Sequence, residues 1–202
     1  MRLKTIYSLI PPCKSLADIG CDHAIVSLHA AKSGIEKVYA VDISQTAVDK
    51  AKRRLYHYKN ATALLSDGFD AIPQRVEVAV ITGMGGMKII EILQKANYKP
   101  TLVLGAQHDS YKLRQYLNGS GYIIEKDFCL IDRNKYYDFI LAKQGESESL
   151  DEIQLTYGKF YKEKNEFLKV RVEKEIANLI TYSTCESEER LKMAKEVEKW
   201  QR

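Results

Sequence analysis

Short apolar runs alternate with helix-like segments over the first 142 residues of the chain. An apolar run bounded by turn residues is typical of a buried strand, and apolar residues three or four apart are typical of a helix. We predict strands ending at Ile19 and Asp42, and further strands at 63–65, 76–81 and 101–104. Helices are predicted at 24–33, 45–55, 87–93 and 111–117, with Ser44 as an N-cap.

The last two apolar runs of this region, 122–130 and 136–142, have no helix between them. Alternating strands and helices indicate a doubly wound α/β sheet of the Rossmann-like kind, and a terminal strand pair indicates an antiparallel edge strand. We therefore expect one domain over 1–144, whose ligands would lie at the carboxyl ends of the strands.

After Gln144 the pattern changes, because residues 145–149 are polar and residues 150–202 are charged and helical. One apolar stripe consists of Leu168, Val172, Ile176 and Leu179, and a second consists of Met193, Val197 and Trp200. Residues 181–186 interrupt them, and Ser183 with Glu186 has the spacing of a capping box. We predict a second domain over 150–202, a helical hairpin or coiled coil. Its stripes are interpreted as the hairpin seam, with a substrate-gripping role as the alternative.

Charge and cysteine content narrow the class of protein. The formal net charge is +4, and residues 150–202 hold 11 basic and 11 acidic side chains, so the excess lies in the first 149 residues. A polyanionic substrate fits this balance, although plain solubility explains it equally well. No apolar run approaches the roughly 18 residues that span a bilayer. The four cysteines lack metal-ligand spacing, so we expect no metal, and free thiols in a cytoplasmic protein.

The most specific motif lies at residues 16–24, where an apolar run ends in Asp18-x-Gly20-x-Asp22 and a helical pattern follows. Gly20 permits a tight turn and close backbone approach. Carboxylates at Asp18 and Asp22 would repel an anionic pyrophosphate, whereas they would attract a cationic sulfonium with an amino-acid tail. The motif therefore favours S-adenosylmethionine (SAM) over NAD as the cofactor.

Carboxylates lie at the ends of the first three predicted strands, at Asp18, Asp42 and Asp67. Asp42 has the offset of a carboxylate that takes ribose hydroxyls, and Asp67 is placed to accept from an adenine amino group, with Gly68 allowing close approach. Each alone could be a helix cap. Three in register predict an adenosine cofactor site. The full set of predicted cofactor contacts is Asp18, Gly20, Cys21, Asp22, His23, Asp42, Ile43, Asp67, Gly68 and Gly83.

The predicted methyl-transfer site combines two segments, Asp22-His23 and the glycine turn at residues 83–86. Methylases of exocyclic amines often carry Asn-Pro-Pro-Tyr or Asp-Pro-Pro-Tyr where this chain has the glycine turn. Here the backbone of the turn supplies all of its polar groups. Glycines would let a flat base approach the sulfonium, with Met84 packed on the base. The catalytic candidates are Asp22, His23, Gly83, Met84 and Gly85. The alternatives are a helix cap at Asp22, local packing of His23 and an ordinary glycine turn.

Together, Asp-Ile-Gly-x-Asp-His-Ala at 18–24, Gly-Met-Gly-Gly at 83–86 and the helical tail resemble the bacterial tRNA (adenine-22-N1)-methyltransferase family, TrmK. The resemblance implies a class I SAM-dependent methyltransferase fold, SAM as methyl donor, and transfer to N1 of an adenine in the tRNA D-arm. Asp18, Gly20, Asp22 and His23 match the family's first motif, and residues 67–68 and 83–86 match later motifs. Asp42 stands where the family usually has glutamate.

The chain departs from that family in three places. Cys21 stands where serine is usual, residues 25–27 replace Tyr-Leu-Pro, and Gly105-Ala106-Gln107 replaces a Gln-Pro-Asn. The last change leaves open whether Gln107 or His108 takes over a substrate contact.

Adenine N1 carries an accessible lone pair, so catalysis needs in-line placement and an acceptor for the new positive charge, for which Asp22 is the candidate. The base is expected to be flipped out of the folded RNA. We expect a monomer with tRNA as partner and no membrane association. The alternatives are a methyltransferase for another RNA or a small molecule, and a non-catalytic RNA-binding relative.

Overall fold

The computed structural model describes residues 1–146, 148–182 and 185–202 and contains one seven-stranded sheet of order β3-β2-β1-β4-β5-β7-β6. Strands β1 to β5 are parallel, and β7 runs antiparallel to both β5 and β6. The strands are β1 (Ser15–Ile19), β2 (Lys37–Asp42), β3 (Ala61–Leu65), β4 (Val78–Met84), β5 (Thr101–Ala106), β6 (Tyr122–Asp132) and β7 (Lys135–Gln144).

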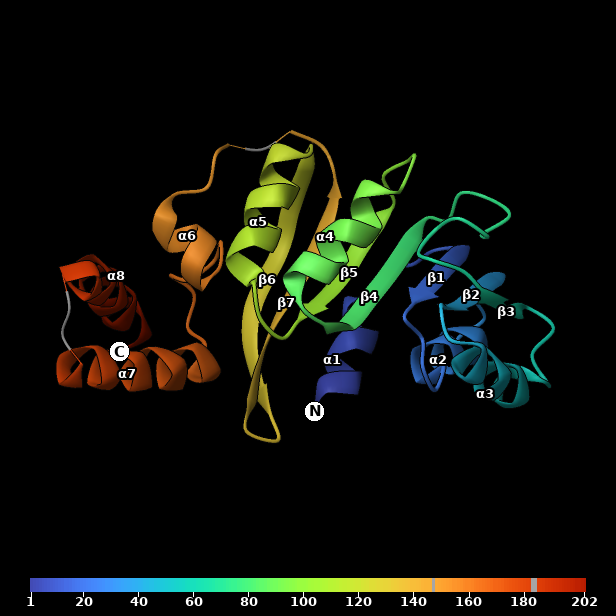
Figure 1. The fold of residues 1–202 in the computed structure, drawn as a ribbon, viewed down its shortest axis with the longest axis horizontal. Coiled ribbons are helices and arrows are strands. Elements are labelled where there is room, and N and C mark those ends of the chain that lie inside the picture. Colours follow the sequence, from blue (N-terminus) through green and yellow to red (C-terminus); the bar gives the residue numbers. More distant parts are fainter. Residues whose placement is uncertain (147, 183–184) are drawn as a thin grey trace.

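Helices cover both faces of this sheet. Helices α4 and α5 lie across the face turned to the viewer in Figure 1, and their Ile89 and Leu113 are fully buried against it. On the other face, Ile6 and Val26 pack a second core. The helices are α1 (Arg2–Leu9), α2 (Ile25–Lys32), α3 (Gln45–Leu55), α4 (Gly86–Gln94), α5 (Ser110–Gly119), α6 (Glu152–Tyr157), α7 (Glu166–Thr181) and α8 (Cys185–Gln201).

The predicted doubly wound sheet is confirmed, and so is its antiparallel strand pair. The reversed strand is β7, which lies between β5 and the edge strand β6. Helices α1 and α6 were not predicted from the sequence. In α1, Leu3, Ile6 and Leu9 recur every three residues, but the helix spans only 8 residues and has no side-chain cap, so its stability comes from burial of Ile6 and Leu9.

Helices α7 and α8 form the predicted antiparallel hairpin. The Asn165 backbone N–H, at the start of α7, donates to Oε1 of Gln201, at the end of α8, over 2.8 Å. Leu168, Val172 and Val197 are buried in the seam as predicted. The prediction that Trp200 lies in the seam is wrong, because its side chain is 44% exposed and its indole N–H donates to Glu196 on the same helix. Ser183, the first residue of the predicted capping box with Glu186, lies outside the described residues.

A buried ionic network joins the C-terminal helices to the β6–β7 end of the sheet, where Figure 1 places them. Arg114 of α5 is fully buried and donates to both carboxylate oxygens of Asp127, at 2.8 and 2.9 Å. It also donates to the Leu155 carbonyl of α6 over 3.1 Å. Arg171 of α7 donates to Asp138 of β7 over 3.1 Å. Together these bonds hold α6 and α7 at one position on the sheet.

No helix among the described residues combines the length and the apolar character that crossing a bilayer requires.

Candidate functional site

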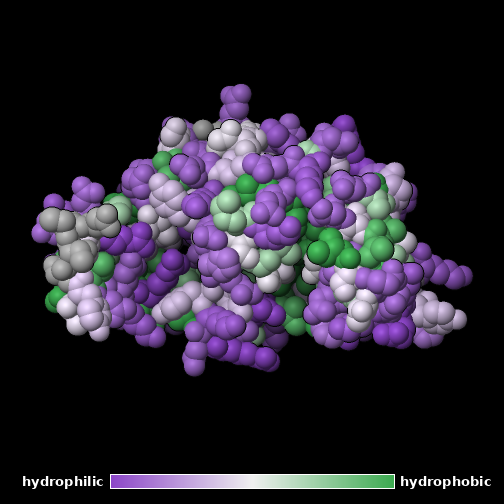
Figure 2. Space-filling model, viewed as in Figure 1, coloured by the Kyte–Doolittle hydropathy of each residue, from purple (hydrophilic) through white to green (hydrophobic). Residues whose placement is uncertain are grey.

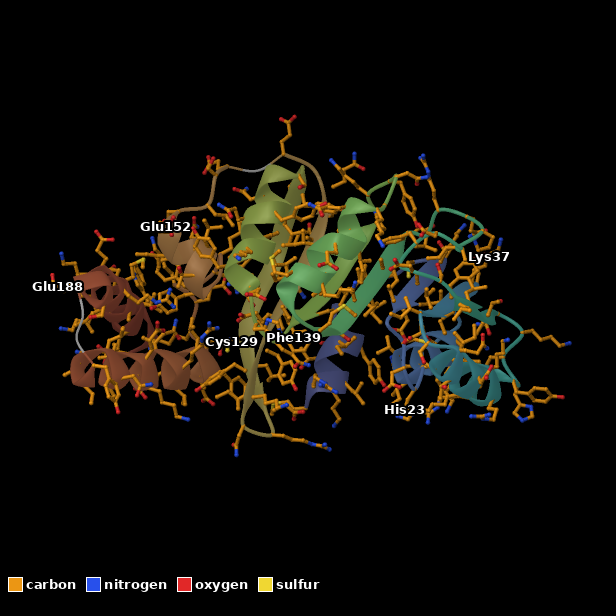
Figure 3. All side chains as sticks on the ribbon, in the orientation of Figure 1. His23, Lys37, Cys129, Phe139, Glu152 and Glu188 are labelled. Carbon is orange, nitrogen blue, oxygen red and sulfur yellow. The ribbon has the colours of Figure 1, made fainter. Side chains whose placement is uncertain are left out.

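A cavity of about 290 Å³ lies at the carboxyl edge of the sheet, between α1, the β1–α2 turn and the end of β4. His23 lies at this edge, away from Lys37, which begins β2 at the opposite edge (Figure 3). The cavity brings together predicted residues from both motifs. Its lining residues are Arg2, Leu3, Ile6, Asp18, Gly20, Cys21, Asp22, His23, Ile25, Val26, Thr82, Gly83 and Gln107. Sequence reasoning missed the contribution of α1, for which the spacing of its apolar residues was the available signal.

The turn from β1 to α2 has an unusual backbone. Gly20, Asp22 and Ala24 all have positive φ angles, of 76°, 42° and 50°. The N–H groups of Gly20 and Cys21 both donate to the Val41 carbonyl, at 2.8 and 3.0 Å, which fastens the turn to β2. Positive φ at two non-glycine turn positions, Asp22 and Ala24, stores strain, and such strain is concentrated at binding sites.

Gly20 is also required by a close contact with the second motif. A Cβ at this position would lie 2.7 Å from Cε of Met84. The two motifs, 64 positions apart, therefore pack directly against each other. Met84 thus contacts the β1 turn, and its packing on a substrate base stays a prediction.

Asp18 is buried beneath this turn. One of its carboxylate oxygens accepts from the Ser27 backbone N–H over 3.0 Å and from the Ser27 hydroxyl over 2.6 Å. Burial raises the pKa of Asp18 to about 6, and the nearby Asp42 carboxylate contributes in the same direction. The Asp18 side chain binds the first turn of α2 and lines the cavity. Its contacts in the structure are therefore those of a helix-capping carboxylate, the alternative considered for it above.

Asp42 is placed as expected for a ribose-binding carboxylate. Its Oδ2 accepts from the Asp22 backbone N–H over 3.1 Å, and its Oδ1 accepts from the Ser44 N–H over 2.9 Å. These bonds fix the carboxylate, and each oxygen keeps a lone pair for a further donor. Two apolar side chains beside it, Ile43 and Leu65, are 68% and 51% exposed.

This arrangement passes a simple test of fit for an adenosine cofactor. Leu65 is the register partner of Asp42 on the neighbouring strand, and Ile43 follows Asp42 directly. A ribose bound to Asp42 would place its base against these exposed apolar groups and remove them from water. Figure 2 shows hydrophobic surface over the β1–β3 part of the sheet.

Of the predicted carboxylates, Asp18 and Asp22 line the cavity, whereas Asp42 and Asp67 do not. Asp67 forms an ion pair with Lys95 at the end of α4, and the Lys95 hydrogen bond lowers the pKa of Asp67. The neighbouring Gly68 faces α4, because a Cβ there would lie 3.2 Å from Cγ2 of Ile92. In this structure the Asp67–Gly68 segment therefore contacts α4, while its backbone stays close to Asp42 through the bond from Ser66 N–H to the Asp42 carbonyl.

Asp22 and His23 project from the turn at the mouth of the cavity. The Asp22 carboxylate is 65% exposed and lies 3.7 Å from the Lys50 ammonium and 3.5 Å from Nε2 of His23. His23 is itself half exposed. The residue before Asp22, Cys21, is buried, and burial raises the pKa of its thiol to about 12, so the thiol stays protonated at neutral pH. Cys13, Cys21 and Cys129 are free thiols, as the sequence indicated.

The glycine segment at 83–86 divides into two parts. Gly83, with φ of 85°, has open space where a Cβ would be. A Cβ at Gly85 would overlap the imidazole ring of His108, and one at Gly86 would lie 2.9 Å from the carbonyl carbon of Asp109. The last two glycines therefore accommodate the loop after β5, and Gly83 alone leaves room for a substrate. The sequence left open whether His108, which lies next to a departure from the family pattern, takes part in a substrate contact.

Comparison with known proteins agrees with this geometry. Residues 1–140 match the family described as a methyltransferase domain. A Mycoplasma pneumoniae protein described as a candidate tRNA methyltransferase is 32% identical over 167 residues, covering 78% of each chain. The Bacillus subtilis tRNA (adenine(22)-N(1))-methyltransferase is 28% identical over 167 residues, covering 78% of this chain and 70% of the relative.

Solved structures of similar fold extend over the whole chain. The Mycoplasma capricolum TrmK in complex with S-adenosyl-homocysteine has a TM-score of 0.89 at 22% identity, covering 100% of this chain and 98% of its own. A Streptococcus pneumoniae protein in complex with SAM has a TM-score of 0.86 at 23% identity, with 98% of both chains covered. The similarity includes the C-terminal helices, which the family match over residues 1–140 leaves out.

Proposed function

We propose that this chain, which belongs to the methyltransferase-domain family and to its TrmK branch of bacterial tRNA methyltransferases, methylates N1 of adenine 22 in the tRNA D-arm. The methyl donor is SAM, the cofactor to which the chemistry of the cavity is suited. The observation that carries the proposal is Asp42, fixed by two backbone N–H groups, beside a cavity that the two sequence motifs share.

The charge at this edge suits a cationic cofactor. Asp18, Asp22 and Asp42 surround one turn. Among the described residues, the basic side chains within 4 Å of the Asp22 carboxylate are Lys50 and the neighbouring His23. SAM, when bound, supplies a methyl group on a positively charged sulfur. Asp42 would hold its ribose, Ile43 and Leu65 its base, and the Gly20–His23 turn its amino-acid end.

The acceptor side of the cavity lies at Gly83 and Gln107. The Gln107 amide donates to the Gly83 carbonyl over 3.1 Å, so the open space at Gly83 is bordered by a fixed backbone and a fixed amide. Adenine N1 needs no deprotonation before it attacks, so the protein must place the base in line and stabilise the cationic product. Asp22, at the mouth of the cavity, is the candidate for that stabilisation, with His23 beside it.

RNA binding completes the proposal. Residues 1–144 would form the catalytic domain and residues 150–202 a helical domain that helps to hold the tRNA. The proposal includes a monomeric enzyme in the cytoplasm, where its tRNA substrate is found. Exposed basic side chains at the end of α3, namely Lys52, Arg53 and Arg54, are candidates for phosphate contacts.

The proposal is tested by incubating unmodified tRNA transcripts with the protein and SAM labelled in the methyl group, and then mapping the modified nucleotide. We expect label at N1 of adenine 22 and none in a matched transcript with guanine at that position. Label at another nucleotide would contradict adenine 22 as the methylated position. Label only in small acceptors would contradict the RNA substrate, and SAM binding without any transfer would contradict an enzyme.

A further inference from the structure

We propose that His108 is a base-stacking residue, whose imidazole ring supports the acceptor adenine next to the Gly83 opening. The inference rests on the proposed function and adds a residue that positions the substrate. It starts from the unusual packing of the ring on a glycine.

The His108 ring lies directly on the backbone of Gly85. A Cβ at Gly85 would overlap the ring, 2.6 Å from Nε2 and 2.8 Å from Nδ1. The side chain is nevertheless 69% exposed. One side of the ring is therefore covered by the glycine segment, while much of the remainder faces solvent beside the methyl-transfer cavity.

The ring is held in place by its neighbours. Nδ1 of His108 lies 2.7 Å from Oδ2 of Asp109, and Asp109 has a positive φ of 58°. The Gly86 N–H donates to the His108 carbonyl over 2.8 Å, and the Gln107 N–H donates to the Met84 carbonyl over 3.2 Å. Such a fixed aromatic surface loses little conformational freedom when a base stacks on it.

The location matches the path of a flipped base. Gln107, the preceding residue, lines both the 290 Å³ cavity and a neighbouring cleft of about 390 Å³ toward the C-terminal helices. His108 lines that cleft, together with Arg171 of α7 and Arg190 of α8. The ring therefore lies between the place where the base must arrive and a region with two guanidinium groups.

The cavity has few other groups that could stack on a base. Among its described lining residues His23 carries the single aromatic ring, and that ring lies on the cofactor side, next to Asp22. Base–aromatic stacking tolerates any base and needs only an accessible ring face. His108 supplies such a ring on the acceptor side, where Gly83-Met84-Gly85-Gly86 has no aromatic side chain.

The test uses the full chain and a tRNA transcript with 2-aminopurine at position 22, whose fluorescence reports stacking. The variants are His108→Ala, His108→Phe and the control His57→Ala, which removes an exposed histidine beyond the far end of α3. We expect the bound probe to be quenched more by the wild type, His57→Ala and His108→Phe than by His108→Ala, in which the flipped base lacks a ring to stack on. On ordinary tRNA, His108→Ala should lower kcat/KM by about tenfold or more, while SAM affinity by calorimetry changes less than about twofold.

Wild-type quenching and turnover retained in His108→Ala would overturn the inference. So would His108→Phe behaving like His108→Ala, because an imidazole hydrogen bond would then matter rather than stacking. Parallel loss of SAM affinity in His108→Ala would also overturn it. The proposed function fails separately, if the wild type leaves adenine 22 unmethylated in ordinary tRNA.

Discussion

At the β6–β7 end of the sheet three charged side chains are buried and paired with one another, whereas at the β1–β2 end Asp22 and Asp42 face a cavity or solvent. Arg114, Asp127 and Asp138 are each at most 5% exposed. Burial alone would raise the pKa of Asp138, but Arg114 and Arg171 hold it below its usual range. Asp22 and Asp42, by contrast, keep accessible oxygens.

The difference separates groups whose partners all lie within the protein from groups that are free to bind a ligand. A buried charge with a full set of protein partners has no capacity left for a substrate, and removing one partner leaves the other uncompensated. An exposed or half-buried carboxylate contributes little to stability, but it can bind a donor from outside. Mutations at the two ends should therefore affect different measurements.

The largest expected effect is on stability, from Arg114→Met. The variant leaves the buried Asp127 without a guanidinium partner and Asp138 with Arg171 alone, so the free energy of unfolding should fall by about 3–5 kcal/mol. Urea denaturation measures it, with Lys192→Met, an exposed position on α8, as the control. A loss below about 1 kcal/mol would show that the network does not anchor the C-terminal helices.

The second prediction concerns pH and Asp18, whose folded pKa of about 6 lies above its ordinary value of 3.8. Between these two values the folded chain binds more protons than the unfolded chain. The contribution of Asp18 to stability therefore falls as pH rises through this window and is constant above it.

Asp18→Asn lacks this titration and keeps an acceptor for Ser27. Its stability relative to the wild type should increase between pH 4 and pH 6.5, on the order of 2–3 kcal/mol. Urea denaturation across that range checks the prediction. A difference that does not change with pH would mean that Asp18 is not shifted in the folded protein.

At the opposite end of the sheet, Asp42→Ala should weaken SAM binding at least tenfold and change stability much less than Arg114→Met. Two ribose hydroxyls on one carboxylate would make two charge-assisted bonds of roughly 1.5–3 kcal/mol each. Isothermal calorimetry measures the affinity, and Asp49→Ala on α3, which removes a nearby carboxylate, is the control. Unchanged affinity would remove Asp42 from the cofactor site.

Asp22→Asn sharpens the comparison within the cavity, because it removes a charge and keeps the shape of the side chain. Removing a preorganised buried partner costs about a hundredfold in turnover or more, but Asp22 is 65% exposed and close to Lys50. We therefore expect a loss of about tenfold in kcat, with SAM affinity changed less. Single-turnover kinetics would show this. Equal losses in both would make Asp22 a cofactor ligand and pass the catalytic role to His23 and the glycine segment.

The smallest expected effects are on the salt dependence of tRNA affinity, which tests whether the RNA lies on α3 or on the C-terminal helices. Replacing Lys52, Arg53 and Arg54 with Gln at one end, or Lys174, Lys192 and Lys195 at the other, removes three exposed charges in each case. Each lost phosphate contact should reduce the salt slope of tRNA affinity by about 0.7–0.9. Filter binding at several salt concentrations compares the two triples. A slope that neither triple changes would place the RNA on another surface.

Part of this molecule could be derived from the sequence, because it depends on neighbours along the chain. The alternation of apolar runs predicted the sheet and the hairpin, since the periods of strand and helix are local properties. Ser44 was recognised as an N-cap, and its hydroxyl accepts from Ala47 N–H. Asp42 was predicted to lie at a strand end, and it is the last residue of β2; parallel strands present their carboxyl ends at one edge.

The tertiary structure decided the rest, because it depends on contacts between distant residues. Asp67 comes just after β3, much as Asp42 ends β2, but Lys95, 28 positions away at the C-cap of α4, pairs with it. The glycines at 85 and 86 suggested room for a base, yet the loop at 108–109 fills that space. Which carboxylates remain open to a ligand is thus set by the packing of helices and loops around the strand ends, and no local pattern of the chain contains that information.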